Sequence, residues 1–186
     1  MRFLRGVIFV FVMSTISAVV AGGTARQQAE AEWKKWESQS TPLIALSGAQ
    51  SKIERSEFLR ITNSKDWVAY WCRHVGKSEK EHDEYYNKPG VPEVDFDSCL
   101  VVATTLGKTS NTAGIRARYH ETPDGTIQMR LAPKSYQTGP KADAVQPYGF
   151  FVIPRSKQRL VVELDTNHLM GAPPKWEKVA SFANLK

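Results

Sequence analysis

The sequence predicts an α+β fold, mainly an antiparallel β-sheet with one packed helix at about residues 65–75. Two observations carry this prediction. The stretch CLVVATTL at 99–106 is apolar or β-branched at consecutive positions, which is typical of a strand covered on both faces. The stretches 115–120 and 127–131 alternate apolar and polar residues on either side of a Pro-Asp-Gly turn, which indicates a hairpin with one polar face.

The beginning of the chain has the features of an export signal. Two arginines precede an uncharged apolar run that ends in small residues. This order predicts a cleaved signal peptide over residues 1–23, with cleavage after Ala21 or Gly23. An uncleaved membrane anchor is the alternative, because the apolar run reaches about 18 residues only when Gly22 and Gly23 are counted. We expect an extracytoplasmic protein, periplasmic or secreted, with no stable membrane insertion after cleavage.

The rest of the chain is long enough for one domain with a hydrophobic core. Residues 24–52 are polar and interrupted by Ser-Thr-Pro and Ser-Gly, so we expect a loosely attached arm or linker there. A single domain with a C-terminal tail is predicted over residues 53–186. The formal charge of the whole chain is +6, with both signs interspersed, and no basic cluster with interleaved aromatic residues points to nucleic acid.

Signals at both ends define the predicted helix. Residues 58–61 predict a short strand before it, and either Asn63 or Ser64 can cap its first turn. Gly76 can end the helix, since glycine accepts the left-handed conformation that follows a last turn. Residues 77–91 then form a charged loop without fixed spacing of its acidic or histidine residues.

The second half of the domain adds two further strands. The stretch YGFFVIP at 148–154 predicts a second central strand, because it is almost wholly apolar. Residues 155–158 are polar and precede the apolar run 160–164, so these two strands are expected to form another hairpin.

The chain has two cysteines, Cys72 and Cys99. An even number of cysteines in an oxidising compartment favours a disulfide, so we predict a bond between them, with two thiols as the alternative. Metal binding by Cys72, His74 and His82 fits no usual ligand spacing. We therefore expect no metal and no cofactor.

Catalytic motifs are missing from the sequence. The four histidines are not accompanied by G-x-S-x-G, by the dinucleotide-binding glycines or by H-E-x-x-H. Gly107, Lys108 and Thr109 look like the end of a phosphate-binding loop, but Val102 stands where its first glycine is needed. We predict that the protein is not an enzyme, and a small hydrolase is the less favoured alternative.

Four basic side chains lie on the polar face of the first predicted hairpin: Arg116, Arg118, His120 and Arg130. Cross-strand pairing would bring them close together. Such a patch suits an acidic protein surface or an anionic glycan, so these are the candidate binding residues. An ordinary solvated strand surface, as in a purely structural envelope protein, is the alternative.

Three motifs carry a resemblance to a known family. They are PEVDF at 92–96, TAGI at 112–115 and Pro147 with Tyr148. Their order, over roughly residues 57–165, resembles the C-terminal domain of PrcB-like proteins, a family named for a subunit that associates with and stabilises an exported protease. The resemblance implies a non-catalytic domain that binds and stabilises another exported protein, such as a protease.

The motif residues are expected to have structural roles. Pro92 bounds the turn before the central strand and Phe96 lies within it. Asp95 is expected to bond neighbouring backbone N–H groups. Gly114 is expected where the backbone needs a positive φ or approaches another segment closely, and Pro147 and Tyr148 at the entry into a strand.

Overall fold

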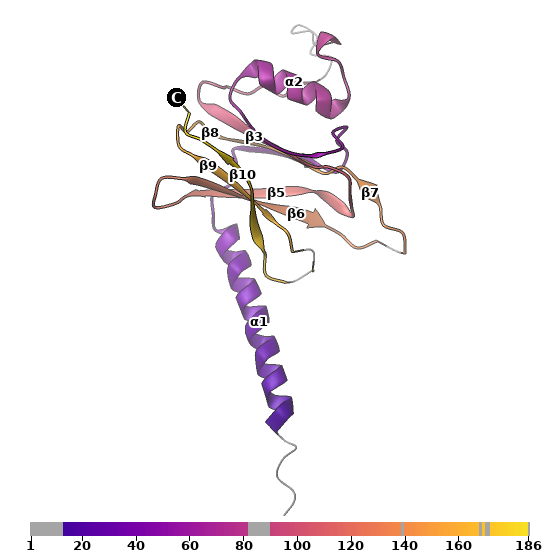
Figure 1. Cartoon of the computed structure of the whole chain (residues 1–186), viewed down its shortest axis with the longest axis vertical. Helices are drawn as coiled ribbons and strands as arrows, with labels where there is room; N and C mark the ends of the chain where they lie inside the picture. Colours follow the sequence, from indigo (N-terminus) through magenta and orange to yellow (C-terminus); the bar gives the residue numbers. More distant parts are fainter. Residues whose placement is uncertain (1–12, 82–89, 139, 168, 170–171, 186) are drawn as a thin grey trace, which may run out of the picture.

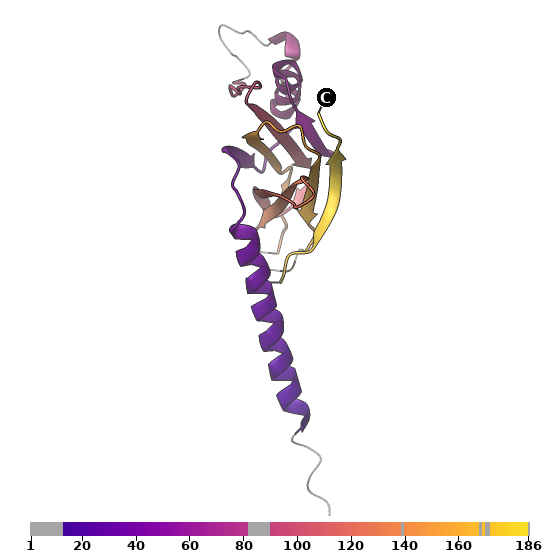
Figure 2. The ribbon, with the colours of Figure 1, turned by 90° about the vertical axis from the view of Figure 1, so that its left-hand side faces the viewer.

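The computed structural model describes residues 13–81, 90–138, 140–167, 169 and 172–185, and side chains from residue 25 onward. Two four-stranded sheets pack face to face (Figures 1 and 2). The helix α2 (Ser64–Val75) lies over the outer face of one sheet, and the long helix α1 (Met13–Glu37) projects away from the other end of the body. The predicted α+β class, mainly antiparallel, is confirmed.

Each sheet joins strands from distant parts of the chain. The first sheet has the order β1 (Ile44–Gly48), β8 (Tyr148–Pro154), β3 (Cys99–Leu106) and β2 (Ser56–Ile61). The second has the order β10 (Trp176–Phe182), β9 (Leu160–Asp165), β6 (Ile127–Ser135) and β5 (Thr112–Glu121). A short ribbon pairs β4 (Thr109–Ser110) with β7 (Ala144–Val145), and a 3-10 turn η1 covers Glu79–Glu81. Neighbouring strands are antiparallel except β6 and β9, which are parallel.

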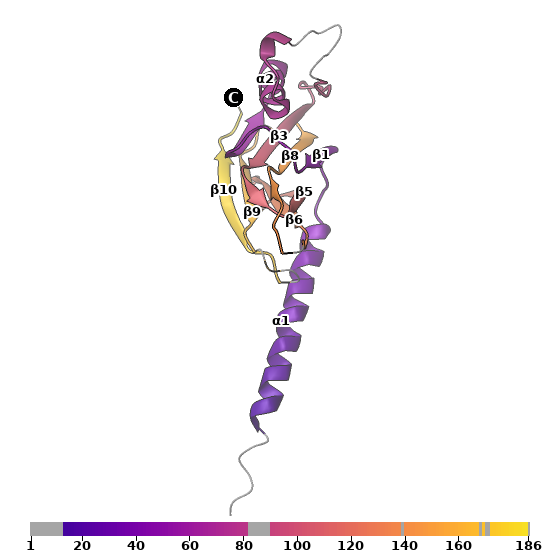
Figure 3. The same ribbon diagram turned by 90° about the vertical axis from the view of Figure 1, so that its right-hand side faces the viewer.

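The two sheets also meet along their edges, so the sandwich resembles a flattened barrel (Figure 3). On one side the backbone N–H of Ile115 in β5 donates to Ser47 Oγ in β1 at 2.6 Å. Gly114 makes this approach possible: its φ is +145°, and a Cβ there would lie 2.5 Å from Ser47 Oγ. On the other side the guanidinium of Arg60 in β2 lies 5.6 Å from the ring of Phe182 in β10.

The central strand β3 is buried on both faces, as its continuous apolar sequence predicts. Leu100 and Val102 face the second sheet and pack with residues such as Met129 and Val162. The alternate residues of β3 and β8 face α2, whose aromatic side chains cover Phe150. Burial of both faces of one strand is therefore what joins the three layers.

The predicted capping of α2 is confirmed. The side chain of Asn63 accepts a hydrogen bond from the N–H of Asp66 at 2.9 Å. Gly76 has φ +73° and its N–H bonds the carbonyl oxygen of Arg73 at the end of the helix. Both ends of the helix thus have hydrogen-bond partners for backbone groups that a helix leaves unpaired.

The predicted hairpin between 148–154 and 160–164 is wrong. β8 belongs to the first sheet and β9 to the second, where β9 lies between β6 and β10. Arg155 explains the crossing, because its guanidinium donates to the carbonyls of Thr62 and Phe96 and holds the end of β8 on the first sheet. The chain then turns across to cover the open side of β6.

The predicted boundaries of the domain also differ from the structure. Residues 24–52 contribute β1, which pairs along its whole length with β8, and the expected C-terminal tail contains β10. An unpaired strand edge leaves backbone groups without hydrogen-bond partners, which explains why both segments add a strand to a sheet.

The structure holds Cys72 and Cys99 as thiols, which corrects the predicted disulfide. Cys72 lies in the last turn of α2, next to His74, whose ring is 4.2 Å from that of Tyr148. Tyr148 pairs with Thr105, which is six residues from Cys99 along β3, or about 20 Å in an extended strand. A disulfide needs Cα atoms within about 7 Å of each other.

The predicted leader falls only partly within the structure. Residues 1–12 lie outside the described residues, and α1 begins at Met13. None of the described helices has both the length and the hydropathy that crossing a membrane requires. Cleavage of a signal peptide stays a prediction.

Candidate functional site

The structure brings the four predicted binding residues together on the outer face of β5 and β6. Arg118 and Arg130 are directly paired across the two strands, and Arg116 and His120 flank Arg118 on the same face of β5. We call these four residues the basic face. The end of α1 lies against it, so the residues have neighbours within the same chain.

Tryptophan rings stack on the arginines of the basic face. The guanidinium of Arg116 lies 4.9 Å from the ring centre of Trp36 and 5.7 Å from that of Trp33. The guanidinium of Arg118 also lies over Trp36, at 5.5 Å. Trp36 is 1% exposed, so α1 is anchored on the sheet through a buried side chain. Such cation–π contacts stabilise the docked helix.

Arg130 also has partners within the chain, and His120 is half-buried. Arg130 donates from Nε to Glu163 Oε2 at 2.9 Å and lies 5.2 Å from the ring of Trp176. Burial, with the positive charge of Arg130 adding to it, lowers the pKa of His120, so its imidazole is neutral at neutral pH. The basic face therefore holds α1 and β10 in place, and only Arg116, with 44% of its side chain exposed, is widely open to solvent.

A serine and a histidine meet in the core beside α2. His74 Nδ1 lies 3.0 Å from Ser51 Oγ, but Ser51 is 1% exposed and His74 5%. Burial lowers the pKa of His74 to about 4. Within the described residues no carboxylate contacts this imidazole, and Ser51 Oγ accepts the N–H of Ile53 at 3.0 Å. The pair thus fastens the segment before β2 to α2.

The PrcB-like motif residues form part of the scaffold. Asp95 accepts hydrogen bonds from the N–H of Asp97 and the hydroxyl of Ser98, and its own carbonyl accepts the N–H of Cys99. The carbonyl of Pro92 accepts the indole N–H of Trp67 at 2.8 Å. These contacts fix the turn that leads into β3.

The other motif residues act in the same way. The carbonyl of Phe96 is one of the acceptors of Arg155, and Pro147 is buried with its carbonyl accepting the N–H of Leu106. The ring of Tyr148 lies between Gly48 and His74. Each residue has a structural partner, as its position in the sequence suggests.

An open groove of about 1040 Å³ lies at one end of the sandwich. It is formed where β2 begins and where β3, β6 and β9 end, so it occupies the mouth of the flattened barrel. The ribbon of β4 and β7 and the segment after β6 form its rim. The ends of barrels and sandwiches are frequent ligand sites, because loops there surround a cavity that the strands hold open.

Asn111 fixes the rim of this groove. It is a non-glycine residue with a positive φ, +53°, among the described residues. Its N–H donates to the carbonyl of Asp143, its Oδ1 accepts the N–H of Asp143 at 2.8 Å, and its carbonyl accepts the N–H of Tyr136 at 2.9 Å. A left-handed backbone conformation is unfavourable for most residues and persists where several contacts impose it.

The charged side chains that line the groove already have hydrogen-bond or ion-pair partners within the chain. Asp165 accepts the N–H groups of Asn167 and Lys175, at 2.9 and 2.8 Å, and Lys108 forms an ion pair with Glu54 at 2.9 Å. The hydroxyl of Tyr136 lies 3.3 Å from Asp143 Oδ2. The rest of the described lining consists of hydroxyl, amide and apolar side chains. The described lining of the groove therefore offers hydrogen bonds and apolar contact without a free acid or base.

No group of three or more potential metal ligands occurs among the described residues. His82, considered above as a ligand, lies outside the described residues. Comparisons of the chain with protein-family models, with curated proteins and with solved structures each give no match.

The sequence interpretation did not find the groove. It gave no role to the segment SYQT at 135–138. The cluster of hydroxyl and amide side chains at 135–138 was a signal in the sequence, but only the fold brings Asn111 next to it. The groove itself depends on four strand ends that only the fold brings together.

Proposed function

We propose that this protein is an exported, non-catalytic binding domain that associates with and stabilises another extracytoplasmic protein. The observation that carries the proposal is the groove at the mouth of the sandwich. It is open and its rim is held by Asn111, while its acidic and basic groups are bonded within the chain. Such a lining suits the backbone and uncharged side chains of an extended peptide segment.

The resemblance of the PEVDF and TAGI motifs to PrcB-like proteins suggests a protease as one kind of partner. Two alternatives receive less support. The basic face, where the sequence suggested an anionic glycan, has Arg116, Arg118 and Arg130 stacked on tryptophan rings. A hydrolase would have to use Ser51 and His74, which are buried.

Capture of partners from the envelope fraction of the native cells tests the proposal. The expected result is one stoichiometric protein whose thermal stability rises when this protein is added. Retention of glycans with no protein would favour the glycan-binding alternative. Turnover of a substrate by the isolated protein, abolished by His74→Gln, would contradict the non-catalytic proposal.

A further inference from the structure

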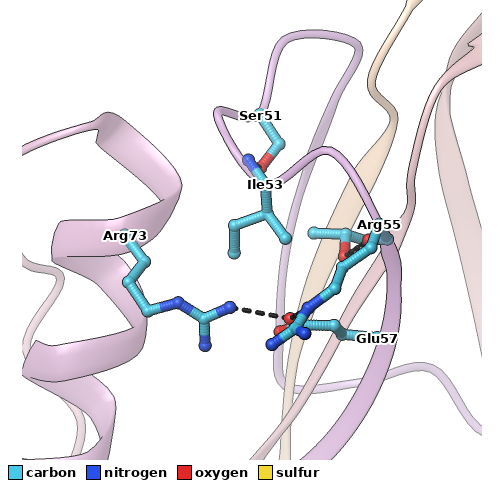
Figure 4. Close-up of polar contacts among 6 residues, drawn as sticks. Ser51, Ile53, Arg55, Glu57 and Arg73 are labelled. Carbon is cyan, nitrogen blue, oxygen red and sulfur yellow. Dashed lines mark hydrogen bonds and ion pairs between the residues drawn. The ribbon is translucent and has the colours of Figure 1, made fainter.

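A second depression, of about 380 Å³, lies between α2 and the segment that leads into β2. Lys52, Ile53, Glu54 and Arg55 line it from that segment, and Arg73 reaches it from α2. Figure 4 shows the side chains of Arg55 and Arg73 converging on the carboxylate of Glu57 from two elements. Side chains alternate between the two faces of a strand, so Arg55 and Glu57 face away from Ser56, which lines the groove.

Glu57 orients both guanidinium groups. Its Oε1 accepts hydrogen bonds from Arg55 Nε at 2.5 Å and from Arg73 Nη2 at 2.7 Å. Its side chain is 11% exposed. Burial by itself would raise the pKa of Glu57, but the hydrogen bonds from Arg73 and Arg55 outweigh it and hold the pKa below its usual value. The two arginines therefore favour the ionised form of Glu57.

The depression has an excess of positive charge. One carboxylate faces two guanidinium groups, and Lys52 adds a third cation at the rim. Glu54, the acidic residue of the described lining, is paired with Lys108 at 2.9 Å. The second guanidinium thus has no carboxylate of its own within the described lining.

Donor groups of both arginines remain accessible. Arg55 bonds Glu57 through Nε and Arg73 through Nη2, and their side chains are 78% and 45% exposed. The guanidinium of Arg73 also lies 5.5 Å from the ring of Tyr70, which restricts its movement. Two oriented guanidinium groups with unused N–H donors match the planar, two-oxygen geometry of a carboxylate.

We propose that Arg55 and Arg73, positioned by Glu57, bind a carboxylate of an acidic segment in the partner protein. The inference deepens the proposed function, on which it rests, by naming the chemistry of the partner at this contact. The contact does not depend on the groove, because Arg55 and Arg73 lie outside the groove lining.

A direct binding measurement tests the inference. Fluorescence anisotropy would follow a labelled ten-residue peptide rich in Asp and Glu, and its Asn and Gln counterpart, with the full chain at low salt. We expect the acidic peptide to bind at least about tenfold more tightly, and Arg55→Gln and Arg73→Gln each to weaken it by about tenfold. The matched control is Arg159→Gln, an exposed arginine of another surface that removes the same charge.

Each outcome decides the matter. Equal weakening by Arg159→Gln would show that only the overall charge matters. Equal binding of the amide peptide would show that a carboxylate is not recognised. Either result overturns the inference. Displacement of the peptide by inorganic phosphate at equal concentration would overturn the assignment to an acidic protein segment. Binding of the acidic peptide together with failure to capture a protein partner would count against the proposed function alone. Unchanged melting of Arg55→Gln would show that loss of binding is not loss of folding.

Discussion

The basic face and the groove are both polar surfaces of the same sandwich, but their side chains differ in what they already contact. On the basic face, Arg116 and Arg118 are stacked on Trp36, and Arg130 is bonded to Glu163. In the groove, the charged groups are bonded to other residues of the chain, and a wide surface of hydroxyl, amide and apolar groups is left open. The more charged surface is therefore the one with less capacity to bind a partner.

The comparison shows why charge in a sequence is a poor measure of availability. An arginine on a strand can contact an acidic partner, but it can equally stack on an aromatic ring of the same chain. Which of the two occurs depends on Trp33, Trp36 and Trp176, which lie far from β5 in the sequence and contact one another in the fold.

Among the changes that test this comparison, replacement of Trp36 by alanine should have the largest effect on stability. Trp36 is 1% exposed and anchors α1 on the basic face, so Trp36→Ala should lower the free energy of unfolding by roughly 3–5 kcal/mol. Urea unfolding measures the change. Glu32→Ala, an exposed position on the same helix, is the control and should change little. Equal stability of the two variants would mean that the helix is not docked on the basic face.

The pH dependence of stability tests a second polar contact inside the fold, the one between Ser51 and His74. His74 is buried, and its pKa is about 4 against an ordinary value of 6.5. Between pH 6.5 and pH 4, His74 is therefore protonated in the unfolded chain but neutral in the folded protein. Stability should therefore fall as the pH decreases from 6.5 to 4, by up to roughly 3 kcal/mol from this residue.

Urea unfolding of wild type and His74→Gln over that pH range isolates the contribution of this histidine. The wild-type curve should descend more steeply than that of the variant as the pH decreases. Parallel curves would show that the Ser51–His74 pair is not buried as described.

Charge reversal on the basic face should have a smaller effect on stability. Arg116→Glu with Arg118→Glu removes the stacking on Trp33 and Trp36 and places new carboxylates near Glu37, which lies 3.9 Å from Arg116. The expected loss is about 1.5–3 kcal/mol, at roughly 0.5–1 kcal/mol for each of the three cation–π contacts. If these residues were ordinary solvated strand surface, which was the alternative in the sequence analysis, little loss would be expected. Thermal melts distinguish the two descriptions, and an unchanged melt would favour the solvated surface.

Local signals in the sequence predicted the elements whose partners are near in the chain. Asn63 and Gly76 mark the two ends of α2, and the Pro-Asp-Gly turn joins β5 to β6. The continuous apolar run of β3 predicted burial on both faces. In each case the physical cause lies within about a dozen residues of the element that it determines.

Elements that depend on distant pairing could not be predicted in the same way. β1 and β10 are short strands at sheet edges, and the parallel pairing of β6 with β9 joins residues more than thirty positions apart. The groove combines the ends of four strands, so no single stretch carries its pattern. The residues of the basic face were predicted to come together, and they do. That α1 covers them was not predicted, because Trp33 and Trp36 lie in the segment that was assigned to a loosely attached arm.

The central claim is that the groove, and not the basic face, is the main contact with the partner. Ser135 is exposed at the end of β6 and lines the groove, so Ser135→Trp places a large ring in the groove and should change stability by no more than about 0.5 kcal/mol. Ser181→Trp, at an exposed position of β10 outside the groove, is the matched control.

Co-purification of the partner with these two variants and with Arg116→Glu/Arg118→Glu, alongside thermal melts of all three, tests the claim most directly. We predict loss of the partner with Ser135→Trp at an unchanged melting temperature. Ser181→Trp should retain the partner fully, and the charge-reversed variant should retain it wherever it is folded. Full retention by Ser135→Trp, with loss in the folded charge-reversed variant, would contradict the claim and return the binding site to the basic face.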